Sequence, residues 1–233
     1  MIELYTWVTG NCHKIHIALE ELELPYEIRP INIFKGEQFT PEFLAINPNN
    51  KVPAIVDLDG PDGGPFRLFE SGAILLYLAE KAGGLIPSDT AKRFEVIQWL
   101  MLQMSGVGPM GGQALHFRQF AVEQVPYAIN RYTNEIGRLF RLIETRLGQT
   151  PYIAGDDYTI ADIALFPWVR MEQRLGQSFD TLPNIRRWYD TISARPAVQK
   201  GLRVLADRVA APGPLSEDAR SILFGDQQYQ VRS

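Results

Sequence analysis

The chain has few cysteines and no long apolar segment, the features on which disulfide-bonded, Cys-x-x-Cys and membrane-spanning proteins depend. Its 233 residues include a single cysteine, Cys12, so neither an intramolecular disulfide nor a Cys-x-x-Cys metal or redox motif can form. One free thiol is typical of a reducing compartment, and we therefore expect a cytoplasmic protein. The longest apolar run, residues 73–79, is far shorter than the roughly 20 residues that cross a bilayer. Glu3 stands where a signal peptide carries basic residues, so neither membrane insertion nor export is expected.

The charge excess of a nucleic-acid binder is also absent. Lysine and arginine together number 23, against 27 aspartates and glutamates, which gives a formal net charge of −4 and a pI of about 5.5. A nucleic-acid binder needs a basic face to replace the counterions of phosphate, so we expect no such partner. The three histidines, His13, His16 and His116, lack metal-ligand spacing, and no P-loop or Rossmann glycine motif is present. The sequence predicts neither a metal nor a nucleotide.

The first eighty residues mix strand and helix signals. Alternation and β-branched content predict strands at residues 2–7, 26–32, 52–58 and 66–69. Helical spacing and capping residues predict one helix from about Asn11, a second opened by Thr40 and Pro41, and a third capped by Ser71. The order βαβ, then α, then ββα predicts a four-stranded mixed sheet with helices on its faces.

From residue 91 onward only helical signals remain. A first helix is predicted at residues 94–104, and Gly106 to Gly112, which includes Pro109, is expected to interrupt it. Further helices are predicted from Pro126, after a capping box of Thr159 and Asp162, and at residues 184–194. A mixed region followed by an all-α region predicts an α/β domain at 1–81, an all-helical domain at 91–205 and a loosely ordered polar tail at 206–233.

The turn between the first strand and the first helix, residues 9–14, departs from the ordinary pattern. Helix N-termini present unpaired N–H groups and partial positive charge, which stabilise anions, thiolates included. His13 and Lys14 add positive charge where the helix dipole disfavours it, so they either belong to a site or point into solvent. Cys12 also has two interpretations: a nucleophile whose pKa is lowered by these surroundings, or a small buried residue.

Three further places carry groups that could hold a ligand. Pro53 opens a strand, so the backbone of Val52 could pair with a peptide-like ligand as an added strand. Glu70 and Ser71 could clamp the ammonium and carboxylate of an α-amino acid, although an ordinary capped helix gives the same pattern. Arg131 lies beside the apolar stripe of the long helix, at a position where most arginines are solvated.

In this order, the four signals resemble the glutathione-binding site of the glutathione transferases. The resemblance runs from the first strand to about Leu202 and rests most on residues 47–55 (NPNNKVPAI) and 69–78 (FESGAILLYL). The capping box at 159–162 and the Arg-Pro-Ala at 195–197 occur where that family has them. The resemblance implies a thioredoxin-like N-terminal domain followed by a helical-bundle C-terminal domain. Within the superfamily, the motifs are most similar to the bacterial nu-class enzymes, which reduce disulfides with glutathione, and to the yeast nitrogen-catabolite regulator on the same scaffold.

The resemblance also implies a role for each polar residue. The Val52–Pro53 bond would be cis, and the Val52 backbone would pair with the cysteinyl unit of glutathione. Thr9 and Asn11 would donate hydrogen bonds to the thiolate and so lower the pKa of the thiol. The other glutathione-binding residues would be Glu70 and Ser71 at the γ-glutamyl end, Gln38 and Lys51 near the tripeptide, and Arg131 across the interface of a homodimer.

Two positions depart from the nu-class pattern, which has proline at position 10 and glycine at position 12. Gly10 changes the stiffness of the loop. Cys12 matters more, because it places a protein thiol beside the bound glutathione, where a mixed disulfide could form.

The function most consistent with these residues is glutathione-dependent disulfide-bond reduction, with bound glutathione thiolate as the nucleophile and a small disulfide as the substrate. Three alternatives stay open. Conjugation of an electrophile, or peroxide reduction, would use a hydrophobic site lined by Trp7, Val8 and Phe117. In a cysteine-type thioltransferase, Cys12 would be the nucleophile. A non-enzymatic regulator would bind glutathione, reduced or oxidised, without turnover. Each alternative has its own test. A faster rate with a chlorinated aromatic than with a disulfide would indicate conjugation, loss of activity in Cys12→Ser would indicate the thioltransferase, and glutathione binding without turnover would indicate the regulator.

Overall fold

A four-stranded mixed sheet organises the N-terminal part of the chain. The computed structural model describes residues 1–208 and 215–230. Strand β1 (Ile2–Thr6) pairs in parallel with β2 (Tyr26–Pro30) and antiparallel with β3 (Ala54–Asp57), which pairs antiparallel with β4 (Phe66–Phe69). The strand order is β2-β1-β3-β4, so the predicted sheet is confirmed.

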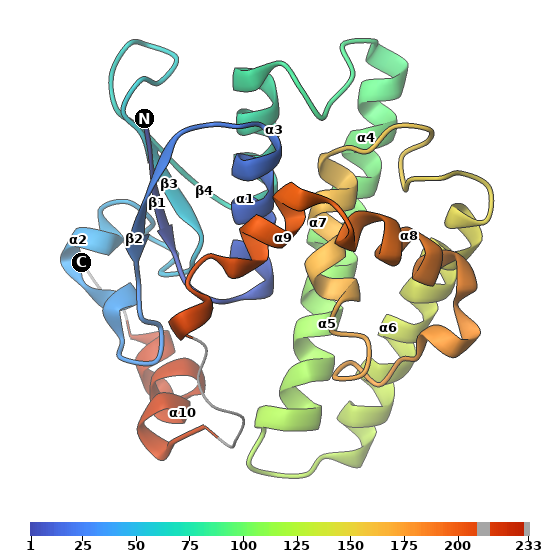
Figure 1. The fold of residues 1–233 in the computed structure, drawn as a ribbon. Coiled ribbons are helices and arrows are strands. Elements are labelled where there is room, and N and C mark those ends of the chain that lie inside the picture. The colour runs from blue at the N-terminus through green and yellow to red at the C-terminus, as the bar shows by residue number, and fades with distance from the viewer. Residues whose placement is uncertain (209–214, 231–233) are drawn as a thin grey trace.

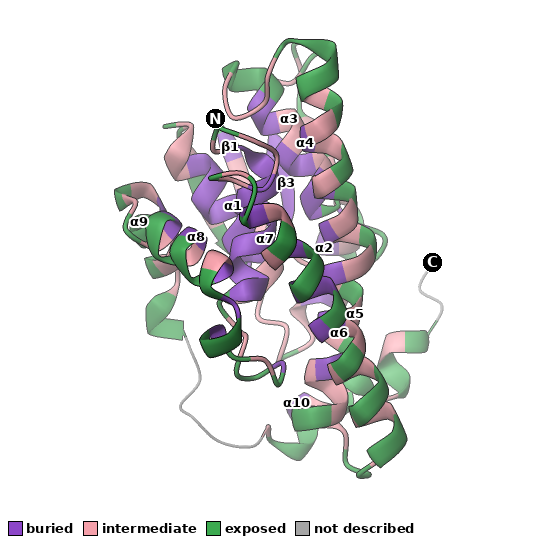
Figure 2. Cartoon of the chain, turned by 90° about the vertical axis from the view of Figure 1, so that its right-hand side faces the viewer, coloured by how far each residue is buried: buried purple, intermediate pink, exposed green. Residues whose placement is uncertain are grey.

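Helices cover both faces of this sheet. Figure 1 shows α1 (Gly10–Glu21) and α3 (Ser71–Ala82) on the side facing the helical region, and the short α2 (Pro41–Leu44) on the opposite side. Thr40 caps α2, since its side chain accepts from the amide of Phe43. Burial is densest where α1, α3 and α7 (Ile160–Val169) meet (Figure 2). The sheet with helices on both faces is what the element order predicts, and the thioredoxin-like arrangement is what the resemblance implies.

The expected cap of α3 by Ser71 is wrong. Ser71 is the first helical residue, and the capping position is taken by Glu70, whose side chain makes no capping bond and whose φ is +69°. The Ser71 hydroxyl oxygen instead accepts from the ammonium of Lys14 at 3.2 Å. The buried Lys14 amine, which is a charged donor when protonated, competes for this oxygen with the backbone amides of α3.

The helical region follows from residue 90. Its long helices are α4 (Thr90–Leu102), α5 (Gly108–Leu115), α6 (Pro126–Leu147), α7, α8 (Pro183–Ser193) and α9 (Pro196–Arg203). The expected interruption after α4 is wrong, because the backbone continues through a π-helical turn at Gln103–Val107 and another at His116–Phe120. Pro109 lies in the first turn of α5, where its missing N–H is tolerated. No helix in the described ranges combines the length and the apolar character needed to cross a membrane.

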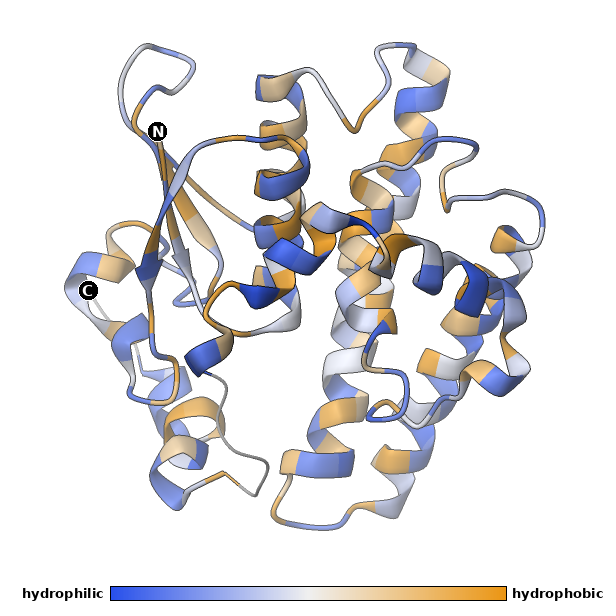
Figure 3. Ribbon diagram, viewed as in Figure 1, coloured by the Kyte–Doolittle hydropathy of each residue, from blue (hydrophilic) through white to orange (hydrophobic). Residues whose placement is uncertain are grey.

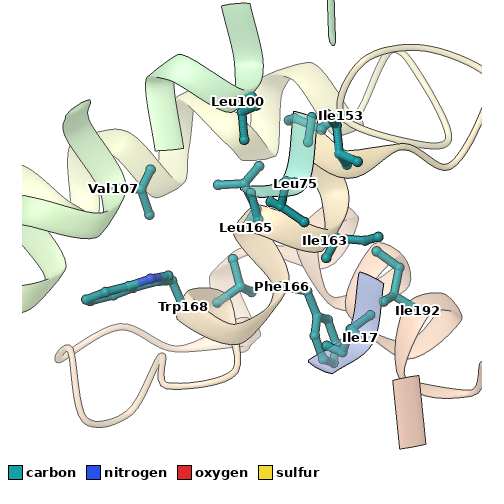
Figure 4. Close-up of a cluster of buried hydrophobic side chains, with 14 of the residues drawn as sticks. Ile17, Leu75, Leu100, Val107, Ile153, Ile163, Leu165, Phe166, Trp168 and Ile192 are labelled. Atoms are coloured by element: carbon teal, nitrogen blue, oxygen red, sulfur yellow. The ribbon is translucent and has the colours of Figure 1, made fainter. Parts of the chain in front are cut away.

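Helix α7 forms the centre of the core, and all ten of its residues are buried. Its ribbon is almost entirely apolar in Figure 3. Figure 4 shows its Leu165 and Phe166 among Leu75, Leu100 and Ile17, which come from α3, α4 and α1. The predicted capping box is confirmed at its N-terminus, where the Asp162 carboxylate accepts from the Thr159 amide. One continuous core therefore joins the sheet region to the helices.

Part of the predicted tail at 206–233 forms regular structure, while residues 209–214 and 231–233 lie outside the described residues. Helix α10 (Glu217–Phe224) is capped by Ser216 and is followed by a 3₁₀ turn at Asp226–Tyr229. Figure 1 shows α10 below the N-terminal domain. Phe224 packs against His116 at 4.9 Å and Phe120 at 5.5 Å between ring centroids. These ring contacts of Phe224 join α10 to the helical region, although most residues of the segment are polar.

Two buried histidines lie where α1 packs on α9. His16 is fully buried and its Nε2 is 2.7 Å from Thr6 Oγ1, while His13 is 8% exposed. The packing is close: a Cβ on Gly201 would lie 2.8 Å from the Ile17 nitrogen. Burial lowers the pKa of His13 to about 4 and that of His16 to about 3. The interpretation that His13 points into solvent is therefore wrong.

We expect the free energy of unfolding to fall as the pH drops below 6.5. The unfolded chain then protonates histidines that the native chain holds neutral, so their contribution is complete above pH 6.5 and is lost toward pH 4. Between pH 6.5 and 5 the loss is roughly 2 kcal/mol for each histidine. Urea unfolding at pH 7 and pH 5 measures it for the wild type, His13→Gln and His16→Gln.

Each single variant should lose about half of the histidine-dependent difference. Burial raises the pKa of Asp162 to about 6, which opposes the trend equally in all three proteins, so the comparison isolates the histidines. A pH dependence that is the same in all three would contradict the prediction.

Candidate functional site

Two hydrogen-bond donors lie at the N-terminus of α1. Thr9 is the capping residue, and its Oγ1 accepts from the amide of Cys12 at 3.2 Å. Asn11 Oδ1 accepts from Trp168 Nε1 of α7 at 3.1 Å. With both oxygens engaged as acceptors, the Asn11 amide protons remain to be donated, and the Thr9 hydroxyl proton can turn either to the Cys12 thiol or to a ligand. The arrangement can stabilise a thiolate placed at this helix terminus.

Cys12 is not the exposed, activated thiol that one interpretation expects. It is fully buried and its Sγ accepts from the Trp7 amide at 3.4 Å. Burial raises the pKa of the Cys12 thiol, against the smaller effect of hydrogen bonds from Thr6, Thr9 and Trp7. The expected lowering of this pKa is therefore wrong, because loss of solvent outweighs the helix terminus. The geometry agrees with the other interpretation, a small buried residue.

The loop before β3 places the backbone of Val52 outside the sheet. The Val52–Pro53 peptide bond is cis, as the resemblance implies, and Val52 lies ahead of β3, outside the ladders of the sheet. Asn47 holds the loop, since its amide donates to the Lys51 carbonyl at 2.6 Å and its Oδ1 accepts from Asn49 N at 2.9 Å. The loop is thus fixed from within, which leaves Val52 available to pair with an extended ligand.

Glu70 and Ser71 meet at the start of α3. Glu70 is exposed and holds a positive φ of +69°, a conformation that a non-glycine residue adopts at a cost and that is frequent at ligand sites. Ser71 is 4% exposed. The carboxylate and the helix terminus therefore offer opposite charge preferences side by side, as the clamp for an α-amino acid requires.

The other predicted glutathione-binding residues, Lys51, Gln38 and Arg131, differ in how far they are exposed and in what they bond to. Lys51 is exposed and its Nζ donates to Gln228 Oε1 of the C-terminal segment at 2.8 Å. Gln38 is 2% exposed and its amide donates to the Ile33 carbonyl at 3.2 Å, so it stabilises its own loop. Arg131 is exposed on α6, and its role across a dimer interface stays a prediction.

A cavity of about 590 Å³ lies between the N-terminal domain and α10. Trp7, which the sequence places in a hydrophobic acceptor site, lines it together with Phe34 and Ile222. Phe117 instead stacks on Tyr132, with ring centroids 5.6 Å apart. The structure thus brings Trp7 together with the C-terminal segment, which the sequence did not connect to the site.

Trp168 and Gln103, which the sequence did not connect to the site, contact its members, and so does Lys14, for which the sequence left a site or solvent open. Trp168 orients the Asn11 amide, and Lys14 and Gln103 form a buried pair beside Ser71. The sequence marked Lys14 as a positive charge at a helix N-terminus, where the helix dipole disfavours it. Nothing in the sequence around Trp168 or Gln103 distinguishes them from ordinary core residues. Within the described residues, no group of three or more His, Cys, Asp or Glu is arranged to hold a metal.

The fold and these groups together define a class of protein. A thioredoxin-like sheet followed by a helical domain, with a cis-proline loop next to the strands that lead into α1 and α3, is the architecture of the glutathione transferases. Residues 10–81 match the family model of the glutathione S-transferase N-terminal domain, and residues 127–196 match that of its C-terminal domain. The chain belongs to the glutathione S-transferase family.

Relatives and solved structures agree with this assignment. The disulfide-bond oxidoreductase YfcG of Escherichia coli strain K12 is 48% identical over 203 residues, which are 87% of this chain and 94% of that protein. A glutathione transferase from Burkholderia graminis, with two glutathione molecules bound per subunit, has a TM-score of 0.84 at 46% identity and covers 88% of each chain. One from Pseudomonas putida, with one glutathione disulfide bound, has a TM-score of 0.83 at 42% identity and covers 88% of this chain and 91% of that one.

Proposed function

We propose that the protein is a glutathione-dependent disulfide-bond reductase whose nucleophile is the thiolate of bound glutathione. The observation that carries the proposal is the pair of donors at the N-terminus of α1: the hydroxyl of Thr9 and the amide of Asn11, each oriented by an internal hydrogen bond. The relative YfcG is named a disulfide-bond oxidoreductase, and solved relatives hold glutathione or its disulfide. These names support the same chemistry for this chain.

Each residue then has a task in binding. Val52 pairs with the cysteinyl backbone of glutathione, Glu70 and Ser71 hold its γ-glutamyl end, and Thr9 and Asn11 donate to its sulfur. Lys51 completes the site near the tripeptide, and Gln38 acts there through the loop that it holds. Donors that prefer the charged sulfur lower the pKa of the bound thiol, which raises the fraction of thiolate at neutral pH.

The reaction balances with two glutathione molecules and no protein nucleophile. The bound thiolate attacks one sulfur of the substrate disulfide, a new S–S bond forms, and the other sulfur leaves as a thiolate. A second glutathione thiolate attacks the mixed disulfide, which releases oxidised glutathione and the second substrate thiol. Two electrons pass from glutathione to the substrate, and the protein supplies position and charge stabilisation.

Glutathione-dependent reduction of a small hydroxyalkyl disulfide tests the function, and Cys12→Ser tests the mechanism. We expect the rate of Cys12→Ser to stay within about twofold of the wild type, because the buried Cys12 thiol has a raised pKa and takes no part. No reductase activity in either protein would overturn the proposed function. Activity lost only in Cys12→Ser would instead make this a cysteine-type thioltransferase.

The proposal extends to assembly and location. We infer a cytoplasmic location from the single free cysteine. We infer a homodimer from the family resemblance alone, with Arg131, which is exposed on α6, reaching the glutathione of the partner subunit. Sedimentation of wild type and Arg131→Ala, alongside glutathione affinity, tests this. A dimer whose affinity for glutathione is unchanged by Arg131→Ala would remove Arg131 from the site.

A further inference from the structure

Lys14 is a buried cation that the proposed reaction leaves without a role. It lies in α1, it is 1% exposed, and its side chain reaches between α3 and the π-helical turn. Its Nζ donates to Gln103 Oε1 at 2.6 Å, to Ser71 Oγ at 3.2 Å and to Met104 Sδ at 3.5 Å. These three acceptors account for all three N–H groups of an ammonium, and none of them is charged.

The surroundings of Lys14 lack a buried counter-ion. Burial lowers the pKa of Lys14 to about 7, and the charges that favour its ammonium are Glu70, which is exposed, and Cys12, whose raised pKa keeps it neutral. His13 and His16 share the helix but stay neutral above pH 6. Among the described residues, the charge of this ammonium is therefore only weakly compensated, which is costly in an interior.

Ser71 connects Lys14 to the glutathione site. Its oxygen accepts from Lys14, so its own hydroxyl proton must point elsewhere, and Met104 Sδ, a weak acceptor, lies 3.6 Å away. A ligand carboxylate at the N-terminus of α3 is a far stronger acceptor for that proton. Gln103 has the matching orientation, since its Oε1 faces Lys14. Its buried Nε2 has no hydrogen-bond partner among the described residues.

We propose that Lys14 is a positioning residue whose ammonium is the buried counter-charge of the γ-glutamyl carboxylate of glutathione, acting through Ser71, so that ligand binding draws a proton onto Lys14. The inference rests on the proposed function, which places that carboxylate at Ser71. The step is a protonation alone: the Lys14 amine gains one proton from solvent when the ligand binds and returns it on release. A protonated Lys14 in turn directs the Ser71 hydroxyl toward the ligand.

Titration calorimetry with S-methylglutathione tests the coupling, because this ligand has no thiol to titrate. At pH 7.5, in buffers of different ionisation enthalpy, we expect the wild type to take up more than roughly half a proton per ligand bound. Since the amine is mostly neutral above pH 7, the affinity should fall about tenfold from pH 6.5 to pH 8. Lys14→Met should bind more weakly at pH 6.5, with almost no proton uptake and a flat pH profile.

Met104→Leu is the matched control, because it alters the same buried cluster while it keeps Lys14, Ser71 and Gln103. It should retain the proton uptake and the pH profile of the wild type. Ser71→Ala, which removes the link to the ligand, should lose more affinity at pH 6.5 than at pH 8.

The outcomes separate the two proposals. A wild type that does not bind S-methylglutathione overturns both the proposed function and the role of Lys14. Binding without proton uptake, or equal uptake by Lys14→Met, overturns the role of Lys14 alone. If Lys14→Met does not fold, the proton uptake of the wild type and the pH profile of Ser71→Ala still decide.

Discussion

Replacing both Thr9 and Asn11 by alanine is expected to lower kcat/KM for glutathione-dependent disulfide reduction by about 100-fold or more. The two side chains donate to the sulfur of bound glutathione in the proposed site, and removal of preorganised donors destabilises a developing or resident anion. The pKa of the bound thiol should rise as well, because the hydrogen bonds that favour its charged form are gone. Rates measured from pH 6 to pH 9 should therefore show a profile displaced to higher pH.

Two conservative variants separate donation from folding. Thr9→Ser keeps the cap that Thr9 Oγ1 gives to the Cys12 amide and also keeps a hydroxyl proton, so it should resemble the wild type. Asn11→Asp keeps an acceptor for Trp168 Nε1 but replaces the amide donor by a negative charge, so it should be at least as slow as Asn11→Ala. If the activity of the double alanine variant stayed within threefold of the wild type, neither Thr9 nor Asn11 would be a donor to the glutathione sulfur that matters for the rate.

The N-terminal domain was predictable because its signals are local. Proline and hydroxyl residues mark the start of α2, alternation marks the strands, and Thr9 to Asn11 falls in the turn where a helix begins. Each signal involves residues that are near neighbours in the chain, so periodicity and capping rules suffice. The motifs around residues 47–55 and 69–78 then related these elements to a family.

The errors arose where contacts distant in sequence decide local structure. Glycines and Pro109 after α4 predicted a break, yet the helix continues through a π turn that packs on α3: a Cβ on Gly72 would lie 2.9 Å from Met104. Ser71 has the composition of a cap, but Lys14, 57 residues earlier, takes its oxygen. Tertiary packing overrode propensity in both cases.

The site itself was predictable in outline only. The residues expected to touch a ligand follow from motifs, whereas the residues that orient them do not. Trp168 bonds to Asn11 across 157 positions, and Gln103 bonds to Lys14 across 89. No periodic pattern in the sequence encodes such pairs, because each partner also fits an ordinary core position. The pKa of Cys12 was equally unpredictable from the sequence, because burial, and not the neighbouring residues in the chain, sets it.

Asp162→Ala is expected to lower the free energy of unfolding by about 3 to 5 kcal/mol, an amount that leaves many domains unfolded at 37 °C. The fully buried carboxylate accepts from Ile153 N at 2.9 Å, Thr159 N at 3.0 Å and Trp188 Nε1 at 2.8 Å. Alanine leaves these three buried donors without an acceptor, and each unsatisfied donor costs about 1 to 3 kcal/mol. Urea unfolding at pH 7, followed by circular dichroism, measures the loss.

Two milder variants show whether the lost hydrogen bonds of Asp162, and not a change in helix propensity, cause the loss of stability. Asp162→Asn keeps one oxygen, which can serve Ile153 and Trp188, but turns an amide donor toward the Thr159 amide, so its cost should lie between wild type and Asp162→Ala. Trp188→Phe removes one donor and leaves the carboxylate its other partners, so a loss of about 1 to 2 kcal/mol is expected. Since Asp162 lies at the start of α7, in the shared core of the two regions, the transition should remain a single cooperative one. If Asp162→Ala were as stable as Asp162→Asn, the three donors would be finding other partners, and the network would not be what holds α7 in place.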